Sequence, residues 1–286
     1  MTPSEQVAYE SPRRVRYGWL AFIAAVLIVG SQLIQLSGAH TNVSELTLTL
    51  ITINKRFPID LVGSVINSIG LIALAVVLNW MHKSSAARNP EFRSFIGRLV
   101  LIGAILSSIC SLIYWGVLSS KAHSFVHTGL QTYPQARSLM SGWAIVAPQI
   151  LGEIGSLILA ASIIWISLNA MRVGLLTKPI GYIGVAAGAL VLFPIGAIVP
   201  VIQAFWLAAV ALTIGKRWPG GDPPAWEEGV AVPWPSASGQ QANARAPRER
   251  RPRGSRPTAA VVDVAASDAP AEPARPAAGK RKRKRR

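Results

Sequence analysis

The chain has 286 residues, of which 51% are hydrophobic, yet its formal net charge is +16. Soluble domains rarely combine these two properties, so the composition argues against a single soluble globular domain. The hydrophobic residues concentrate before residue 217, whereas more than half of the 29 Lys and Arg residues follow residue 215. One cysteine, Cys110, excludes an intrachain disulfide and a Cys-rich metal site.

Six apolar runs follow one another along the first part of the sequence, at 17–36, 60–81, 96–118, 143–169, 179–198 and 199–216. A helix needs roughly 20 apolar residues to cross the hydrocarbon core of a bilayer. The pattern therefore predicts an all-α, polytopic membrane helix bundle of about six transmembrane helices. The last two runs are interpreted as a tight hairpin around Pro194 and Pro200, because one helix of about 38 residues would overshoot the bilayer.

The first apolar run is interpreted as a membrane span rather than a signal sequence. Arg13 and Arg14 precede it, but the run is longer than a typical signal core and no convincing small-residue cleavage site follows. We expect residues 1–16 to be a cytoplasmic segment ahead of a six-helix domain at 17–216.

Basic residues near the ends of the predicted spans indicate the orientation, because Lys and Arg are retained on the cytoplasmic side. Nine lie on the side of the N-terminus: Arg13, Arg14, Arg16, Lys83, Arg88, Arg93, Arg98, Arg172 and Lys178. Four lie on the other side: Lys55, Arg56, Lys121 and Arg137. The count predicts a multi-pass protein of the plasma membrane with both termini in the cytoplasm.

Two loops, 37–59 and 119–142, are then extracytoplasmic. In the first, Val43, Leu46, Leu50 and Ile53 recur at helical spacing and favour an interfacial helix, although alternating Leu and Thr residues also permit a short strand. In the second, His123 and His127 stand four residues apart, but neither lies in an HExxH or CxxC context. We expect no metal and no other cofactor.

One ionisable side chain, Glu153, stands deep within a predicted span. A charged carboxylate there costs roughly 2.5–3.5 kcal/mol on insertion scales, so it must be neutral, paired or hydrated. Polar and small residues on its own helix and on others could line a small polar pocket with it: Gln149, Ser156, Asn67, Ser64, Ser107 and Gln203. Glu153 is therefore either a protonatable or cation-binding residue, or a protonated acid that hydrogen-bonds between helices as a structural contact.

Three glycines recur in the predicted fifth helix, Gly181, Gly184 and Gly188, of which the last two form a GxxxG motif. Small residues at this spacing allow close helix packing, and within a six-helix protein we expect internal packing.

The sequence after the predicted spans divides into two parts. Residues 217–236 form a Trp/Pro-rich juxtamembrane segment, expected at the membrane interface or at the cytoplasmic mouth of the bundle with its Trp rings at headgroup level. Residues 237–286 are predicted to be a disordered basic tail. It ends in seven basic residues, Lys280, Arg281, Lys282, Arg283, Lys284, Arg285 and Arg286.

The partner predicted for this tail is the anionic lipid of the bilayer, because each basic residue near a charged leaflet adds about 1 kcal/mol of attraction. Nucleic acid is the competing polyanion, but no aromatic residues are interleaved for base stacking, so specific nucleic-acid binding is not expected. A tail that binds neither is the third alternative. The sequence does not indicate an oligomeric state.

Two stretches, NAMRVGLLTKPIGYIGVAAGAL at 169–190 and RWPGGDPPAWEEGVAVPWPS at 217–236, resemble six-helix, uncharacterised bacterial membrane proteins of actinobacterial type, a family of unknown function. The resemblance implies a shared fold and no assigned activity. Motifs of hydrolases, zinc proteases and nucleotide-binding loops are absent from the sequence. We therefore favour a non-enzymatic membrane protein with a polar pocket, over a small transporter using Glu153 and, least favoured, a membrane-embedded enzyme.

Overall fold

The computed structural model describes residues 2–37, 46–92, 94–128, 130–192, 198–219, 221–232 and 234. All of them belong to one compact unit, residues 1–238. Every regular element within the described part of the chain is helical, which confirms the predicted all-α fold class. Residues 239–286, and with them the polybasic terminus, lie outside the described residues.

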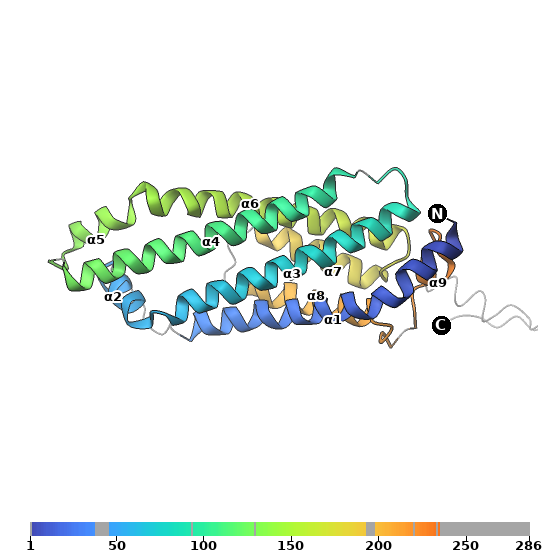
Figure 1. Ribbon diagram of the computed structural model, residues 1–286, viewed down its shortest axis with the longest axis horizontal. Coiled ribbons are helices and arrows are strands. Elements are labelled where there is room, and N and C mark those ends of the chain that lie inside the picture. The colour runs from blue at the N-terminus through green and yellow to red at the C-terminus, as the bar shows by residue number, and fades with distance from the viewer. Residues whose placement is uncertain are drawn as a thin grey trace, which may run out of the picture. The chain divides into compact units, whose positions relative to one another are not determined.

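The elements follow the chain in the order shown in Figure 1. They are α1 (Pro3–Leu36), α2 (Leu46–Arg56), α3 (Ile59–Arg88), α4 (Phe95–His127), α5 (Tyr133–Met140), α6 (Trp143–Arg172), α7 (Lys178–Ala189), the 3-10 turn η1 (Leu190–Leu192), α8 (Ile198–Ile214) and α9 (Pro224–Glu228).

Four of these helices, α1, α3, α4 and α6, are long and apolar enough to cross a membrane. Their outward faces expose large apolar side chains, among them Phe22, Ile69, Ile105 and Leu157. Such a surface is expected where lipid, not water, surrounds the bundle. The predicted spans 179–198 and 199–216 correspond to shorter helices: α7 with η1, and α8.

The long helices extend beyond the apolar runs that predicted them. Helix α1 begins at Pro3 rather than near residue 17, because Thr2 and Glu5 form a capping box. The Glu5 carboxylate accepts a hydrogen bond from the Thr2 backbone at 2.8 Å, and Pro3 fits the first helical position. Helix α4 extends the opposite end of the bundle, and its 33 residues span about 50 Å.

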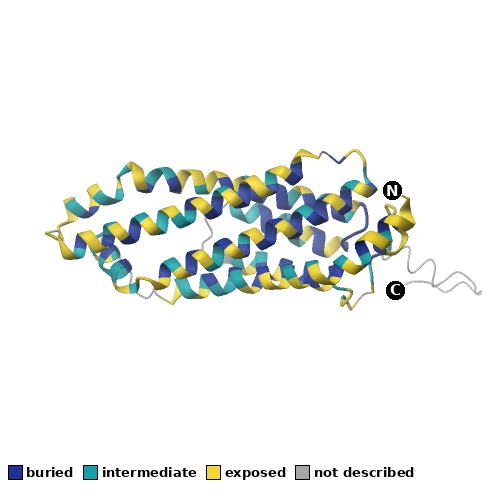
Figure 2. Ribbon diagram, viewed as in Figure 1, coloured by how far each residue is buried: buried dark blue, intermediate teal, exposed yellow. Residues whose placement is uncertain are grey.

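Six elements close into a ring. The pairs in contact are α1 with α3, α3 with α4, α4 with α6, α6 with α7, α7 with α8, and α8 with α1. Buried residues concentrate in the half of the bundle nearer the N-terminus, as the dark blue residues of Figure 2 show. The half nearer α5 contains more exposed residues among those that the structure describes, and α7 and α8 are the shorter helices of the ring.

The loop predicted to hold an interfacial helix contains α2, a helix and not a strand. Its Leu50 and Ile53 are buried against Leu118 and Phe125 of α4, and Ala136 of α5 joins the same cluster. The inner face of α2 therefore packs on the extended end of α4 and forms a small second core.

Helices α4 and α6 touch along their backbones at two glycines. A Cβ atom on Gly103 would lie 2.8 Å from the Leu159 backbone nitrogen, and one on Gly155 would lie 2.7 Å from the Ser107 backbone nitrogen. No rotamer change can relieve contacts with backbone atoms. These two positions therefore set the separation of the two helices.

Helix α7 lies equally close to its neighbours. Gly181 faces the Met171 side chain, Gly184 faces Ser167 and Trp206, and Gly188 faces Ala160 and Ile164. The three glycines thus pack inside the bundle, against α6 and α8.

Replacement of Gly103 by leucine should destabilise the bundle, because the side chain would have to push α6 away from α4. Overpacking of this kind costs about 1–3 kcal/mol. Thermal unfolding in detergent should show a lower midpoint for Gly103→Leu. Gly116→Leu is the matched control on the same helix, since nothing lies within 4 Å of a Cβ at that position. Equal midpoints for the two variants would contradict the proposed contact.

Candidate functional site

A polar cavity lies between the helices of the ring. One part, of about 310 Å³, is lined by residues from α1, α3, α4, α6, η1 and α8. A second part, of about 340 Å³, lies between α3, α4 and α6. Asn67, Ser107 and Ser156 line both parts, so the two adjoin.

Most residues predicted for the polar pocket line this cavity. Glu153 and Gln149 line the second part together with the three shared residues, and Gln203 lines the first. Ser64 does not line either part, but its hydroxyl lies 3.1 Å from that of Ser111, which does.

Hydrogen bonds between helices fix several of the lining groups. The hydroxyls of Ser107 on α4 and Ser156 on α6 lie 3.0 Å apart, next to the close approach of these helices. Ser31 of α1 donates to the side-chain carbonyl of Asn67 on α3 at 3.3 Å. The cavity wall is thus tied together by neutral polar groups.

Glu153 differs from these residues because its side chain is exposed in the second part of the cavity. No described residue forms an ion pair or hydrogen bond with its carboxylate. Gly188 of α7 faces Ala160, and Glu153 lies two turns, about 10 Å, farther along α6. The carboxylate therefore stands beyond the last residue of α7.

Gln32 also lines the cavity and was not among the predicted residues. It follows Ser31 within the first apolar run, and Gln35 stands one turn later. A polar cluster inside an apolar run was the signal that would have identified this face of α1.

An ion pair stands at the start of α3. Arg56, the last residue of α2, donates to both carboxylate oxygens of Asp60, with the shortest distance 2.8 Å. It also donates to the carbonyl of Ile34 at the end of α1. Asp60 is thus engaged by Arg56, and the hydrogen bond to the Asp60 carboxylate raises the pKa of the Arg56 guanidinium above its ordinary value.

Toward the N-terminal end of the bundle an apolar layer closes the cavity. Leu74 and Ile163 line the cavity itself. Leu78, Ile166 and Trp206 follow and are essentially inaccessible. This layer separates the cavity from the N-terminal end of the bundle.

Two ion pairs and a tryptophan lie on the N-terminal side of that layer. We call them the ion-pair cluster: Glu10, Arg14, Arg88, Asp222 and Trp226. Arg88 donates to both carboxylate oxygens of Glu10, at 2.9 and 2.7 Å, and the two side chains are 0% and 2% exposed. Its remaining donors reach the Ala225 and Ser84 carbonyls. A pair buried to this extent is stable only when its other hydrogen-bonding groups are also satisfied.

The second pair of the ion-pair cluster joins Arg14 to Asp222 at 3.0 and 2.8 Å. Arg14 also donates to the Ile214 and Thr213 carbonyls at the end of α8, where the backbone leaves those groups unpaired. The segment after α8 is thereby fastened to α1.

Trp226 is the centre of the ion-pair cluster. Its ring stacks on Trp80 at 5.2 Å, and Trp80 stacks on Tyr17 at 4.6 Å. The guanidinium carbons of Arg14 and Arg88 lie 4.8 and 5.3 Å from the Trp226 ring, and its indole donates to the Leu175 carbonyl at 3.0 Å. Cations at this range are attracted to the ring face.

The ion-pair cluster corrects two expectations. Arg14 and Arg88 were counted only as charged flanks of spans, but both are buried and paired. The segment of Trp226 was expected at the membrane interface or at the mouth of the bundle; the Trp226 ring is 2% exposed, so it packs inside the bundle and is not presented on its surface. The guanidinium groups of Arg14 and Arg88 lie over the Trp226 ring, and their attraction to it favours a buried ring over one at the membrane interface.

The remaining predicted residues fall outside this site. The rings of His123 and His127 lie 4.2 Å apart, and the described residues contain no group of three or more potential metal ligands. Lys280 to Arg286 lie outside the described residues.

No family model, curated protein or solved structure matches the chain. The resemblance to uncharacterised actinobacterial membrane proteins therefore stays a prediction, and the function has to be argued from the site.

Glu10→Gln should destabilise the protein strongly, because it leaves the Arg88 guanidinium buried without a counter-charge. Removal of one partner of such a pair costs about 3–5 kcal/mol. Unfolding by denaturant in detergent measures the loss, with Glu5→Gln as the control, since glutamine also serves in a capping box. The double change Glu10→Met with Arg88→Met should cost less than Glu10→Gln alone, and a larger loss in the double variant would contradict the assignment.

Proposed function

We propose that this chain is a non-enzymatic, multi-pass membrane protein that binds a small cationic or neutral polar solute within its helix bundle. One observation carries the proposal: the polar cavity reaches Glu153, a carboxylate without a partner among the described residues. A structural role as a hydrogen bond between helices would require such a partner.

The chemistry of the lining defines the class of solute. The residues around the cavity offer amides and hydroxyls, from Asn67, Gln149 and Gln203 among others, and a single carboxylate, that of Glu153. Cations and neutral hydrogen-bonding solutes match this set. Anions do not, because no Lys or Arg lines either part.

Glu153→Gln should abolish binding of a cation while leaving the fold intact, because the carboxylate is exposed and unpaired. Thermal unfolding in detergent with Na⁺, K⁺ or methylammonium measures this effect. The wild type should gain stability with at least one cation, and Glu153→Gln should not. Glu91→Gln is the control, since Glu91 is exposed in the link between α3 and α4 and lines neither part of the cavity. An equal gain in wild type and Glu153→Gln would refute cation binding at this site.

A transporter is the second candidate, and the extension of the cavity from Glu153 to Gln203 favours it. The apolar layer around Leu78 and Trp206 would then be the closed gate of one conformation. Proteoliposomes loaded with a pH-sensitive dye test this candidate. Cation-driven proton flux that disappears in Glu153→Gln supports transport, whereas cation binding without flux leaves the binding function alone.

The basic residues support an orientation with both termini in the cytoplasm. The ends of α3 and α6 and the starts of α1, α4 and α7 lie at the same end of the bundle (Figure 1). Lys83, Arg98, Arg172 and Lys178 belong to this end. By the positive-inside rule this end faces the cytoplasm, and the membrane that we propose is the plasma membrane.

We also propose that the terminal residues 280–286 attach to anionic lipid. A dye on Ala278→Cys should lie near headgroup-labelled phosphatidylglycerol in a nanodisc, as measured by energy transfer; Cys110 is buried and should not react. Replacement of all seven basic residues by glutamine, or addition of 1 M salt, should remove the signal, because the attraction of about 1 kcal/mol per residue is electrostatic. Transfer that persists in that glutamine variant would contradict the proposal.

A further inference from the structure

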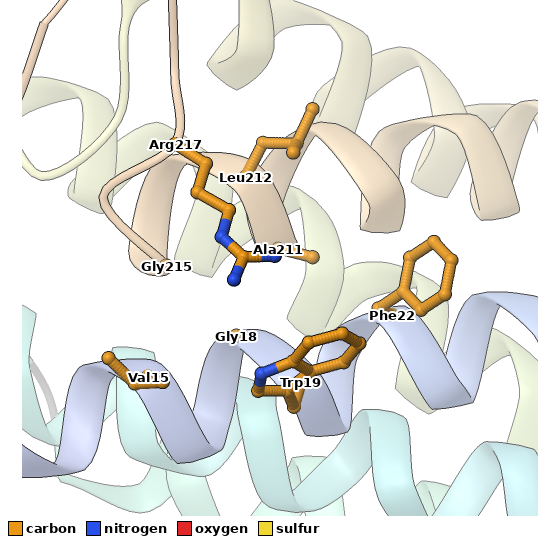
Figure 3. Close-up of a pocket in the computed structure, with 8 residues that line it drawn as sticks. All are labelled: Val15, Gly18, Trp19, Phe22, Ala211, Leu212, Gly215 and Arg217. Atoms are coloured by element: carbon orange, nitrogen blue, oxygen red, sulfur yellow. The ribbon is translucent and has the colours of Figure 1, made fainter.

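A groove on the outer face of the bundle lies between α1 and α8. It has a volume of about 230 Å³ and is shown in Figure 3. Its walls come from Val15, Trp19 and Phe22 on α1 and from Leu212 on α8. All four side chains are exposed, so the groove opens to the lipid side of the helices.

The floor of the groove is formed by small residues where the two helices meet. A Cβ atom on Gly18 would lie 3.1 Å from the Ala211 carbonyl and from the Gly215 Cα atom. This close approach leaves a trough between the larger side chains on either side. The trough is apolar and has the form needed for a flexible hydrocarbon chain.

A positive charge stands at one end of the trough. Figure 3 shows the Arg217 side chain extending toward Trp19, and its guanidinium carbon lies 5.3 Å from the centre of the indole ring. Arg217 is exposed, and no carboxylate among the described residues forms an ion pair with it. Asp222, the next acid along the chain, is bound by Arg14.

The position of the groove along the bundle matches the boundary between headgroups and hydrocarbon in a bilayer. Trp19 stands at the start of the first apolar run, and Arg217 follows the last residue of α8 by three positions. Tryptophan is enriched at this level of a bilayer, and arginine directs its charge to the headgroups.

We propose that this groove holds one anionic phospholipid, with its phosphate on Arg217 and one acyl chain along the trough of Gly18 and Gly215. The volume of the groove, about 230 Å³, is smaller than the roughly 300–1,000 Å³ of pockets that enclose a whole ligand. The groove therefore holds only part of the lipid, and the rest of the lipid stays in the bilayer. The site is independent of the terminal basic residues and of the polar cavity.

Native mass spectrometry of the full-length protein, titrated in detergent with phosphatidylglycerol or phosphatidylcholine, tests the assignment. The wild type should retain one phosphatidylglycerol in preference to phosphatidylcholine. Arg217→Gln should weaken the affinity for phosphatidylglycerol about fivefold and leave that for phosphatidylcholine unchanged. Arg98→Gln is the matched control, since Arg98 is an exposed basic residue at the same end of the bundle, and should behave as the wild type.

Three outcomes would overturn the proposal. Equal retention of both lipids by the wild type means that only non-specific lipid surrounds the groove. Loss of phosphatidylglycerol in the variant with glutamine at 280–286, together with full retention in Arg217→Gln, assigns the lipid to the tail and leaves the tail proposal standing. Competition by soluble glycerol phosphate as strong as by phosphatidylglycerol also overturns it, because the trough would then contribute nothing.

Discussion

The buried pair of Arg88 and Glu10 is the interaction on which the closed end of the bundle depends. Both groups are nearly inaccessible, so each requires the other, and the pair joins the start of α1 to the end of α3. Because Arg88 also binds the Ala225 carbonyl, it holds α9 and therefore Trp226 in place. Trp226 in turn lies near both arginines and the stack of Trp80 and Tyr17.

Because of this arrangement, the basic residues near the ends of the spans have two different roles. Arg13 and Arg98 remain accessible and can report on orientation, whereas Arg14 and Arg88 stabilise the fold. The segment after α8 is likewise not only a link to the tail, since Asp222 and Trp226 both insert into the mouth of the bundle. Arg217, whose charge no described acid neutralises, is the residue of that region to which we assign a lipid-facing role.

Four of the membrane spans could be predicted because apolar length alone determines them, whereas the runs at 179–198 and 199–216 form shorter helices. Most polar residues of the cavity could be predicted because they interrupt apolar runs, although Gln32 was missed. The ends of the helices could not, since α1 begins at a capping box well before its apolar run. The Arg88 and Glu10 pair joins residues 78 positions apart, and nothing local in the sequence connects them. The close contact at Gly103 and Gly155 was equally hidden, because glycine is frequent in membrane helices and only the crossing gives it a partner.

Glycine, which has no side chain, allows two helices to approach closely at two separate crossings in this bundle, with different results. At Gly103 and Gly155 it brings α4 and α6 together below Glu153, where Ser107 and Ser156 then meet at hydrogen-bonding distance. At Gly18 and Gly215 it brings α1 and α8 together on the outside and leaves a trough beside Trp19. The first crossing sits beside polar groups and an unpaired acid, and the second beside apolar groups and an unpaired base. On the two proposals made above, the inner surface would therefore take a cationic or polar solute and the outer surface an anionic lipid.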